Sequence, residues 1–149
     1  MKAWHFWNRS EACAPNWAKV PDTNGIAINK KNTTMYVDRT FVSNAPIVAV
    51  PMGHPSLAKP IGDLSTLGSK VFKGLDDLIM GPHGVLYLPA NLAGEVFSFD
   101  PHNRQACLIA SGLSDPSAIA VGTGHGWKKG ALFVCGFDGT VRELDLVSR

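Results

Sequence analysis

The chain has 149 residues, of which 45% are hydrophobic and 17% charged, so it is long enough for one domain with a real core. Its net charge of +2 is too small to indicate a nucleic-acid partner, and no apolar run approaches the ~18 to 20 residues that span a bilayer. With 15 glycines and 10 prolines, the composition favours a fold with many turns over a helical bundle.

The N-terminal segment, residues 1–20, is rich in aromatic side chains but shows no sustained period. It carries three of the four tryptophans, Trp4, Trp7 and Trp17. A strand, a docked arm or a contact surface would each use such residues. Because the segment lacks the apolar run of about 7 to 15 residues that marks a cleaved signal peptide, we expect no such leader here. This leaves both a cytoplasmic and a secreted location open.

The first group of predicted strands lies in residues 21–74. Three short apolar runs are separated by turn-forming residues, as is typical of strands joined by turns. These runs are Gly25–Ile28, Thr34–Asp38 and Pro46–Pro51. A Gly/Pro-rich loop follows over residues 53–68, and Lys70–Lys73 is predicted as a fourth strand.

The second group, residues 75–112, has the clearest pattern. Its four apolar runs are separated by Gly-Pro-His-Gly, Asn-Leu-Ala-Gly and Asp-Pro-His-Asn. They are Asp77–Met80, Val85–Leu88, Glu95–Phe99 and Ala106–Ala110. Four strands with tight turns make an antiparallel meander. Such a sheet has two apolar faces and cannot bury both alone, so it needs neighbours.

The third group, residues 113–149, supplies three predicted strands. They are Ser117–Val121, Ala131–Cys135 and Thr140–Leu144. Three cysteines without metal-ligand spacing do not form a complete disulfide framework. Because Cys107 and Cys135 alternate with apolar residues in predicted strands, we expect both to be buried free thiols.

The three groups repeat the same order of motifs. Asn24, Asp76 and Pro116 open equivalent first strands, and Tyr36, Tyr87 and Phe133 lie in equivalent second strands. Repeats of about 40 to 50 residues with four strands each are typical of a β-propeller. The predicted fold is therefore all-β, a propeller segment of about three four-stranded antiparallel blades over residues 21–74, 75–112 and 113–149. An open sandwich of about eleven strands is the alternative.

Three blades fall short of the ring, because propellers close with about 4 to 8 blades. Three explanations are open. The chain is a fragment of a longer protein, two or more copies assemble into a ring, or the N-terminal aromatic residues cover an open end.

Several of these motifs resemble those of one family. Residues 21–27, PDTNGIA, with 34–38, TMYVD, resemble the "PNGIA … LYVAD" blade of the senescence-marker-protein/gluconolactonase (regucalcin-like) family. Residues 75–101 are similar to the following "PDG … G-LYVA … GRV-RLDP" blade, and residues 130–134 to the "LYVT" strand of the next one. The resemblance covers about residues 21–146. Strictosidine-synthase-like, paraoxonase-like and NHL-type propellers share much of this strand pattern.

The resemblance implies a six-bladed propeller that hydrolyses a lactone or related ester with the help of calcium. In the family, the Asn of "PNG" and the first Asp of "PDG" bind one divalent metal in the central channel. The matching residues are Asn24, a metal ligand, and Asp76, both a ligand and the general acid/base. Amide and carboxylate oxygens suit Ca²⁺. We therefore expect Ca²⁺ or another divalent metal as cofactor and a small-molecule lactone or ester as partner.

Other readings of these residues stay open. Asn24–Gly25 is also a common turn pair, and Asp76 can satisfy backbone donors at a strand entry. Ca²⁺ takes about 6 to 8 oxygens, and Glu11 does not match the Glu-Gly-Pro turn that supplies another ligand in the family. One chain is thus expected to hold half a site. The alternative function is a non-catalytic binding or assembly module, a homo-oligomer that completes the propeller.

Overall fold

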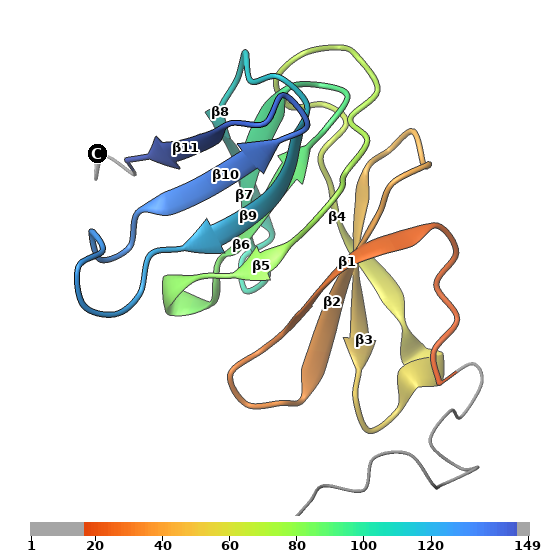
Figure 1. The fold of residues 1–149 in the computed structure, drawn as a ribbon. Coiled ribbons are helices and arrows are strands. Elements are labelled where there is room, and N and C mark those ends of the chain that lie inside the picture. The colour runs from red at the N-terminus through yellow and green to blue at the C-terminus, as the bar shows by residue number, and fades with distance from the viewer. Residues whose placement is uncertain (1–16, 146–149) are drawn as a thin grey trace, which may run out of the picture.

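The computed structural model describes residues 17–145, which fold into three antiparallel β-sheets arranged one after another along the chain (Figure 1). The predicted fold class, an all-β propeller segment, is confirmed. No helix among the described residues is long and apolar enough to cross a membrane. Most of the N-terminal aromatic segment, residues 1–16, lies outside the described part of the chain.

Sheet A comprises the first four strands, each paired with the next. They are β1 (Thr23–Ile28), β2 (Thr34–Arg39), β3 (Pro46–Pro51) and β4 (Lys59–Asp63). A short 3₁₀ turn, η1 (Pro55–Leu57), joins β3 to β4. The first three strands lie where the apolar runs predict them, since each run is bounded by residues that favour turns.

The predicted fourth strand of this sheet was wrong. The edge strand is Lys59–Asp63, which pairs with β3 inside the segment expected to be a loop. Residues 70–73 form no strand but part of the connection to the next sheet. The physical reason is that Lys59–Asp63 already occupies the place beside β3, while Lys73 is held in the connection by its buried ion pair with Glu95.

Sheet B is the central sheet, with strands again in sequential order. They are β5 (Ile79–Met80), β6 (Leu86–Ala90), β7 (Glu95–Asp100) and β8 (Gln105–Ala110). The short turn η2 (Pro82–Gly84) joins β5 to β6. Sheet C has the order β11-β10-β9 and contains β9 (Pro116–Val121), β10 (Leu132–Gly136) and β11 (Val141–Leu144).

The core lies between neighbouring sheets. One buried cluster joins sheets A and B and includes Ile47, Leu88 and Phe97. A second joins sheets B and C and includes Val96 and Leu132. Because adjacent strand residues point to opposite faces, both faces of sheet B are covered, each by a different neighbour. Sheet B therefore has the two neighbours that it needs to bury both of its apolar faces.

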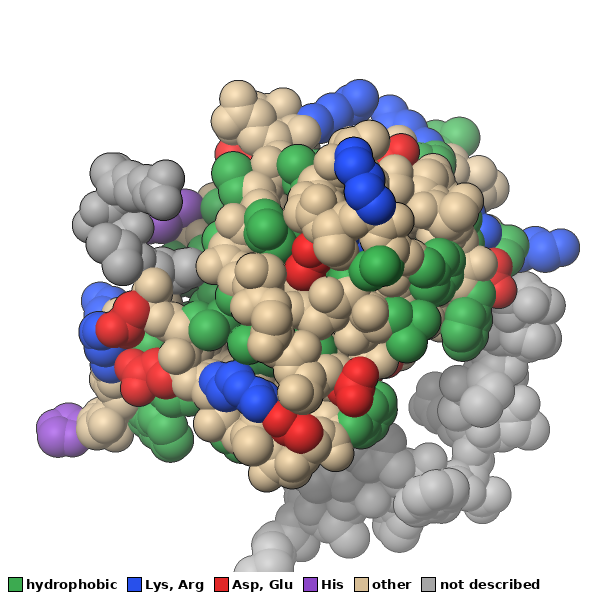
Figure 2. All heavy atoms as spheres, turned by 90° about the horizontal axis from the view of Figure 1, so that it is seen from above, with side chains coloured by type: hydrophobic (Ala, Val, Ile, Leu, Met, Phe, Trp, Pro, Cys, Tyr) green, Lys and Arg blue, Asp and Glu red, His purple; other side chains and the backbone are tan. Residues whose placement is uncertain are grey.

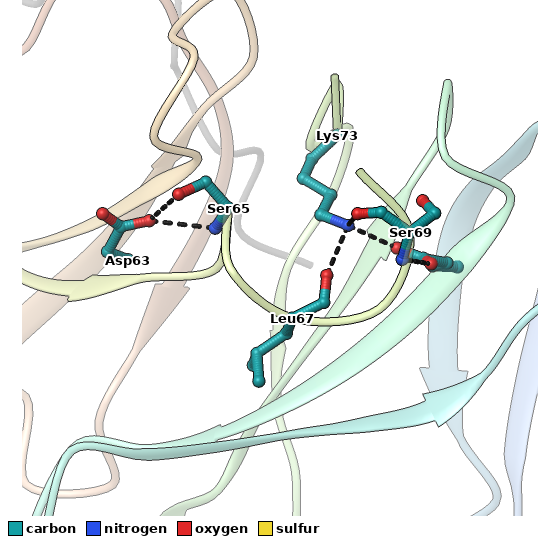
Figure 3. A network of polar contacts seen from close by, with 6 residues as sticks. Asp63, Ser65, Leu67, Ser69 and Lys73 are labelled. Atoms are coloured by element: carbon teal, nitrogen blue, oxygen red, sulfur yellow. Dashed lines mark hydrogen bonds and ion pairs between the residues drawn. The ribbon is translucent and has the colours of Figure 1, made fainter. Parts of the chain in front are cut away.

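The connection from sheet A to sheet B is held by a buried ammonium group (Figure 3). Lys73 Nζ donates to Glu95 Oε2 at 2.7 Å and to the carbonyl oxygens of Leu67, at 2.6 Å, and Ser69, at 2.7 Å. Burial by itself would raise the pKa of Glu95, but the hydrogen bonds from Lys73 and the Ser69 N–H hold it below its usual value. All three ammonium protons thus have acceptors, which is what makes a buried lysine tolerable.

Candidate functional site

Asn24 is positioned by an irregularity in β1. The pairing of β1 with β2 shifts register between Thr23 and Ile26, so two residues, Asn24 and Gly25, lie outside the regular ladder. Bulges of this kind bend a strand and redirect a side chain. Asn24 is exposed at the start of the strand.

Asp76 is positioned by backbone pairing with the end of β6. Its N–H donates to the Pro89 carbonyl at 3.2 Å, Leu75 forms a bridge with Ala90, and the Asn91 N–H donates to the Gly74 carbonyl at 2.8 Å. These bonds extend the edge of sheet B back toward Lys73, whose side chain is buried in its ion pair with Glu95. Asp76 therefore lies on a fixed backbone rather than in a free loop.

The structure brings the two predicted site residues together. Asn24 Nδ2 donates a 2.8 Å hydrogen bond to Asp76 Oδ1, although the residues are 52 positions apart. Asp76 Oδ2 is buried and has no hydrogen-bond partner among the described residues. An ionised carboxylate oxygen without a partner is costly in a buried place. Asp76 Oδ2 is therefore an acceptor that the fold buries but leaves without a partner.

A second carboxylate, Asp38, lies near this pair and was not predicted as a site residue. It is fully buried at the end of β2, accepts the Gly25 N–H at 2.8 Å through Oδ1, and leaves Oδ2 without a partner. Burial, together with the negative charges of Asp77 and Asp76, raises the pKa of Asp38 to about 6, against the opposing effect of the backbone hydrogen bonds from Gly25 and Asn24. Its only sequence signal is a polar residue after three strand residues.

Asp77 serves a different purpose from Asp76. Its Oδ1 accepts the neighbouring Leu78 N–H at 2.8 Å, and its Oδ2 accepts the Ile119 N–H of β9 at 3.2 Å. Both oxygens therefore have partners, and the Oδ2 bond joins the start of sheet B to sheet C. This leaves Asp76 as the acidic residue that faces Asn24.

A hollow of about 220 Å³ lies at this end of the sheets, and both Asn24 and Asp76 line it. Its other polar lining residues already have partners, since Thr40 Oγ1 donates to the Leu75 carbonyl at 2.7 Å and Asn91 Nδ2 to the Pro116 carbonyl at 3.5 Å. The Thr40 bond joins sheet A to the segment that leads into sheet B, and the Asn91 bond joins sheet B to the start of sheet C. The hollow is thus lined by the Asn24–Asp76 pair and by polar groups that hold the sheets together.

The donor chemistry of the pair suits a hard cation, but its number of ligands is small. Asn24 offers an amide oxygen and Asp76 a buried oxygen without a partner, both of the type that Ca²⁺ prefers. Within residues 17–145, no three His, Cys, Asp or Glu side chains are grouped closely enough to hold a metal. The remaining oxygens would have to come from water, substrate or residues outside the described part.

A larger hollow of about 720 Å³ lies at the opposite ends of the strands. Lys30 and Lys31 of the β1–β2 turn line it, together with His83, His102 and Asp100. The lysines and histidines are exposed, as expected of turn residues. Basic and acidic side chains are also scattered over the face shown in Figure 2 rather than gathered in one patch. Among residues 17–145, none of the buried side-chain atoms that lack a partner belongs to a residue lining this larger hollow.

Comparison with known proteins places the fold. No family model and no curated protein matches the chain. A structure of streptogramin B lyase is similar, with a TM-score of 0.60 and 16% identity over 86% of this chain and 42% of that one. Virginiamycin B lyase from Staphylococcus aureus has a TM-score of 0.57 and 13% identity over 86% and 42% of the two chains.

A luciferin-regenerating enzyme is similar as well, with a TM-score of 0.58 and 13% identity over 76% of this chain and 37% of that one. The three are propeller proteins, and the chain spans less than half the length of each. At these identities the similarity establishes the propeller fold.

Proposed function

We propose that this chain forms part of a calcium-dependent hydrolase that opens a lactone or related ester, with Asn24 and Asp76 in its site. The observation that carries the proposal is the contact between these two side chains, which start the inner edges of adjacent sheets, together with the buried Asp76 oxygen that has no partner. The resemblance of the surrounding motifs to those of the gluconolactonase family supports the same assignment.

In this proposal Asp76 carries the proton. Its carboxylate accepts a proton from the attacking water and later gives it to the leaving alkoxide oxygen, as a general base and then a general acid. Asn24 donates to Oδ1 and so fixes the orientation of the carboxylate. The oxygens of Asn24 and Asp76 would hold Ca²⁺, which when bound would supply polarisation of the substrate carbonyl.

Calorimetric titration of Ca²⁺ into the 149-residue chain tests the metal assignment. We expect binding by the wild type and its loss in Asp76→Asn, which keeps the shape of the side chain but removes its charge. Asp63→Asn is the matched control, because Asp63 is an exposed carboxylate that accepts only from Ser65. Absence of binding, or equal binding in Asp76→Asn, would contradict the proposal.

A second candidate is the non-catalytic module that assembles with another copy. It is favoured because no three His, Cys, Asp or Glu side chains among residues 17–145 are grouped to hold a metal, and because this chain spans less than half the length of the propellers it resembles. Two copies would supply about six sheets, within the range in which propellers close. Light scattering distinguishes the cases, since a dimer supports assembly and a monomer of 16.0 kDa opposes it.

A further inference from the structure

Three large apolar side chains surround the hollow that contains Asn24 and Asp76. Phe41 is 77% exposed, Leu92 60% and Phe137 74%. All three line the hollow of about 220 Å³. None of them belongs to the buried clusters that join the sheets. We call these three residues the apolar rim.

The fold places the rim residues at corresponding positions. Phe41 lies in the connection after β2, Leu92 in the connection after β6, and Phe137 in the connection after β10. Each sheet therefore contributes one member, from the loop that follows its second strand. Scattered exposed apolar residues are ordinary, but three that converge on one hollow from three repeats indicate a binding surface.

The polar side chains that line the hollow form hydrogen bonds within the fold. Thr40 and Asn91 donate to backbone carbonyls, and Asn24 donates to Asp76. The hollow therefore combines polar side chains that are fixed by bonds within the fold with three large apolar side chains that are more exposed. This combination suits a ligand with a polar centre and an apolar remainder.

We propose that the substrate is a lactone or ester bearing an alkyl or aryl substituent, which packs on Phe41, Leu92 and Phe137 while its carbonyl lies at the Asn24–Asp76 pair. This inference rests on the proposed hydrolase function for its reaction. In that reaction the water oxygen bonds to the carbonyl carbon, the carbon–oxygen bond of the ester breaks, and the water proton passes through Asp76 to the leaving oxygen.

The test compares two ring-matched probes, δ-valerolactone and δ-dodecalactone, which differ by an alkyl chain. Binding to the full chain is measured by calorimetry, and hydrolysis by pH-stat. We expect δ-dodecalactone to bind at least about tenfold more tightly, because burying several methylene groups contributes more than the ~1.4 kcal/mol that a tenfold change needs. The double variant Phe41→Ser/Phe137→Ser should lose most of that preference.

Leu57→Ser is the matched control, because Leu57 is 63% exposed on η1 and does not line this hollow. The Ca²⁺ affinity of the double variant should equal that of the wild type, which separates the rim from the metal pair. If neither lactone is hydrolysed but the alkyl preference is present and lost in the double variant, the hydrolase proposal fails and the rim stands. Equal binding of the two lactones, no binding of either, or an unchanged preference in the double variant overturns the inference.

Discussion

Gly25 of sheet A lies directly against the backbone of Leu78 in sheet B. A β-carbon built on Gly25 would stand 2.4 Å from the Leu78 nitrogen, 2.6 Å from the Asp77 carbonyl carbon and 2.8 Å from Asp38 Oδ2. Real β-carbons do not approach other atoms so closely, and two of these neighbours are backbone. The contact between the first two sheets, and with it the Asn24–Asp76 hydrogen bond, therefore requires glycine at this position.

We predict that Gly25→Ala lowers the free energy of unfolding by about 1 to 3 kcal/mol, because the added methyl group forces the two sheets apart. Chemical denaturation measures this change. Gly53→Ala is the control, since a β-carbon there meets nothing within 4 Å, and its stability should stay within about 0.5 kcal/mol of the wild type. Equal effects of the two substitutions would show that the close contact is not limiting.

The buried Asp38 predicts a pH-dependent difference in stability. Its pKa in the folded chain is about 6, above the ordinary value of 3.8, so the folded state disfavours the ionised form. The contribution of Asp38 to the free energy of unfolding is fully present below pH 3.8 and is lost as the pH rises through about 6. Asp38→Asn keeps the acceptor for Gly25 but cannot ionise. Its unfolding free energy relative to the wild type should increase by up to about 3 kcal/mol between pH 4 and pH 7.

Urea titrations of both proteins across this pH range measure the difference. Asp100→Asn offers a comparison at a carboxylate that is only partly buried. A difference between Asp38→Asn and the wild type that stays constant with pH would contradict the assigned shift.

The Lys73–Glu95 pair predicts a large cost for removing one partner. Lys73→Met leaves the Glu95 carboxylate buried without its cation, which typically costs about 3 to 5 kcal/mol. Lys73→Met/Glu95→Leu should recover part of this loss, because no charge remains buried. Since Lys73 helps to hold the pKa of Glu95 below its usual value, the loss in Lys73→Met should shrink in acid, where Glu95 becomes protonated.

Thermal and urea unfolding measure both variants. Lys128→Met is the control, because Lys128 pairs with Asp145 at the surface, where the two side chains are 61% and 57% exposed. An ion pair this exposed to solvent contributes little to stability. A loss in Lys73→Met no larger than in Lys128→Met would contradict the role of the buried pair.

The hydrogen bond from the Ile119 N–H to Asp77 should help to hold sheet C against sheet B. Asp77→Ala removes the acceptor of the Ile119 N–H and should speed hydrogen exchange at that amide by about tenfold or more, equivalent to ~1.4 kcal/mol of local stability. Asp77→Asn retains an acceptor oxygen and should exchange nearly as slowly as the wild type. Amide exchange followed by NMR distinguishes the two, and equal rates in both variants would show that the side chain does not hold Ile119.

Much of the fold follows from local sequence pattern. Strands such as Pro46–Pro51 and Glu95–Asp100 were predicted because apolar and β-branched residues there are bounded by turn formers. Because these patterns repeat along the chain, they predict a propeller fold. The same repeat places Asn24 and Asp76 at equivalent positions of successive sheets, and in the structure their side chains are hydrogen-bonded.

The features that were missed depend on distant partners. Lys59–Asp63 contains proline and glycine, and it becomes a strand because it pairs with β3 and because Gly62 lies against Phe99 of sheet B. Lys73 looked like a strand residue because its partner Glu95 is 22 positions away. Cys107 was predicted to be buried but is exposed, since it lies on β8, the outermost strand of sheet B; the predicted free thiol is confirmed.

The two core clusters that flank sheet B have no residue in common. Side chains of β6 and β7 alternate between them, so each neighbouring sheet interacts with its own face of the centre. Cooperativity then passes from sheet to sheet, as in other repeat proteins, rather than across the whole molecule at once. Partial opening at the C-terminal end would release Phe137 from the rim while the Asn24–Asp76 pair stayed closed. The proposed ligand affinity and the proposed metal affinity would then be lost at different temperatures on heating.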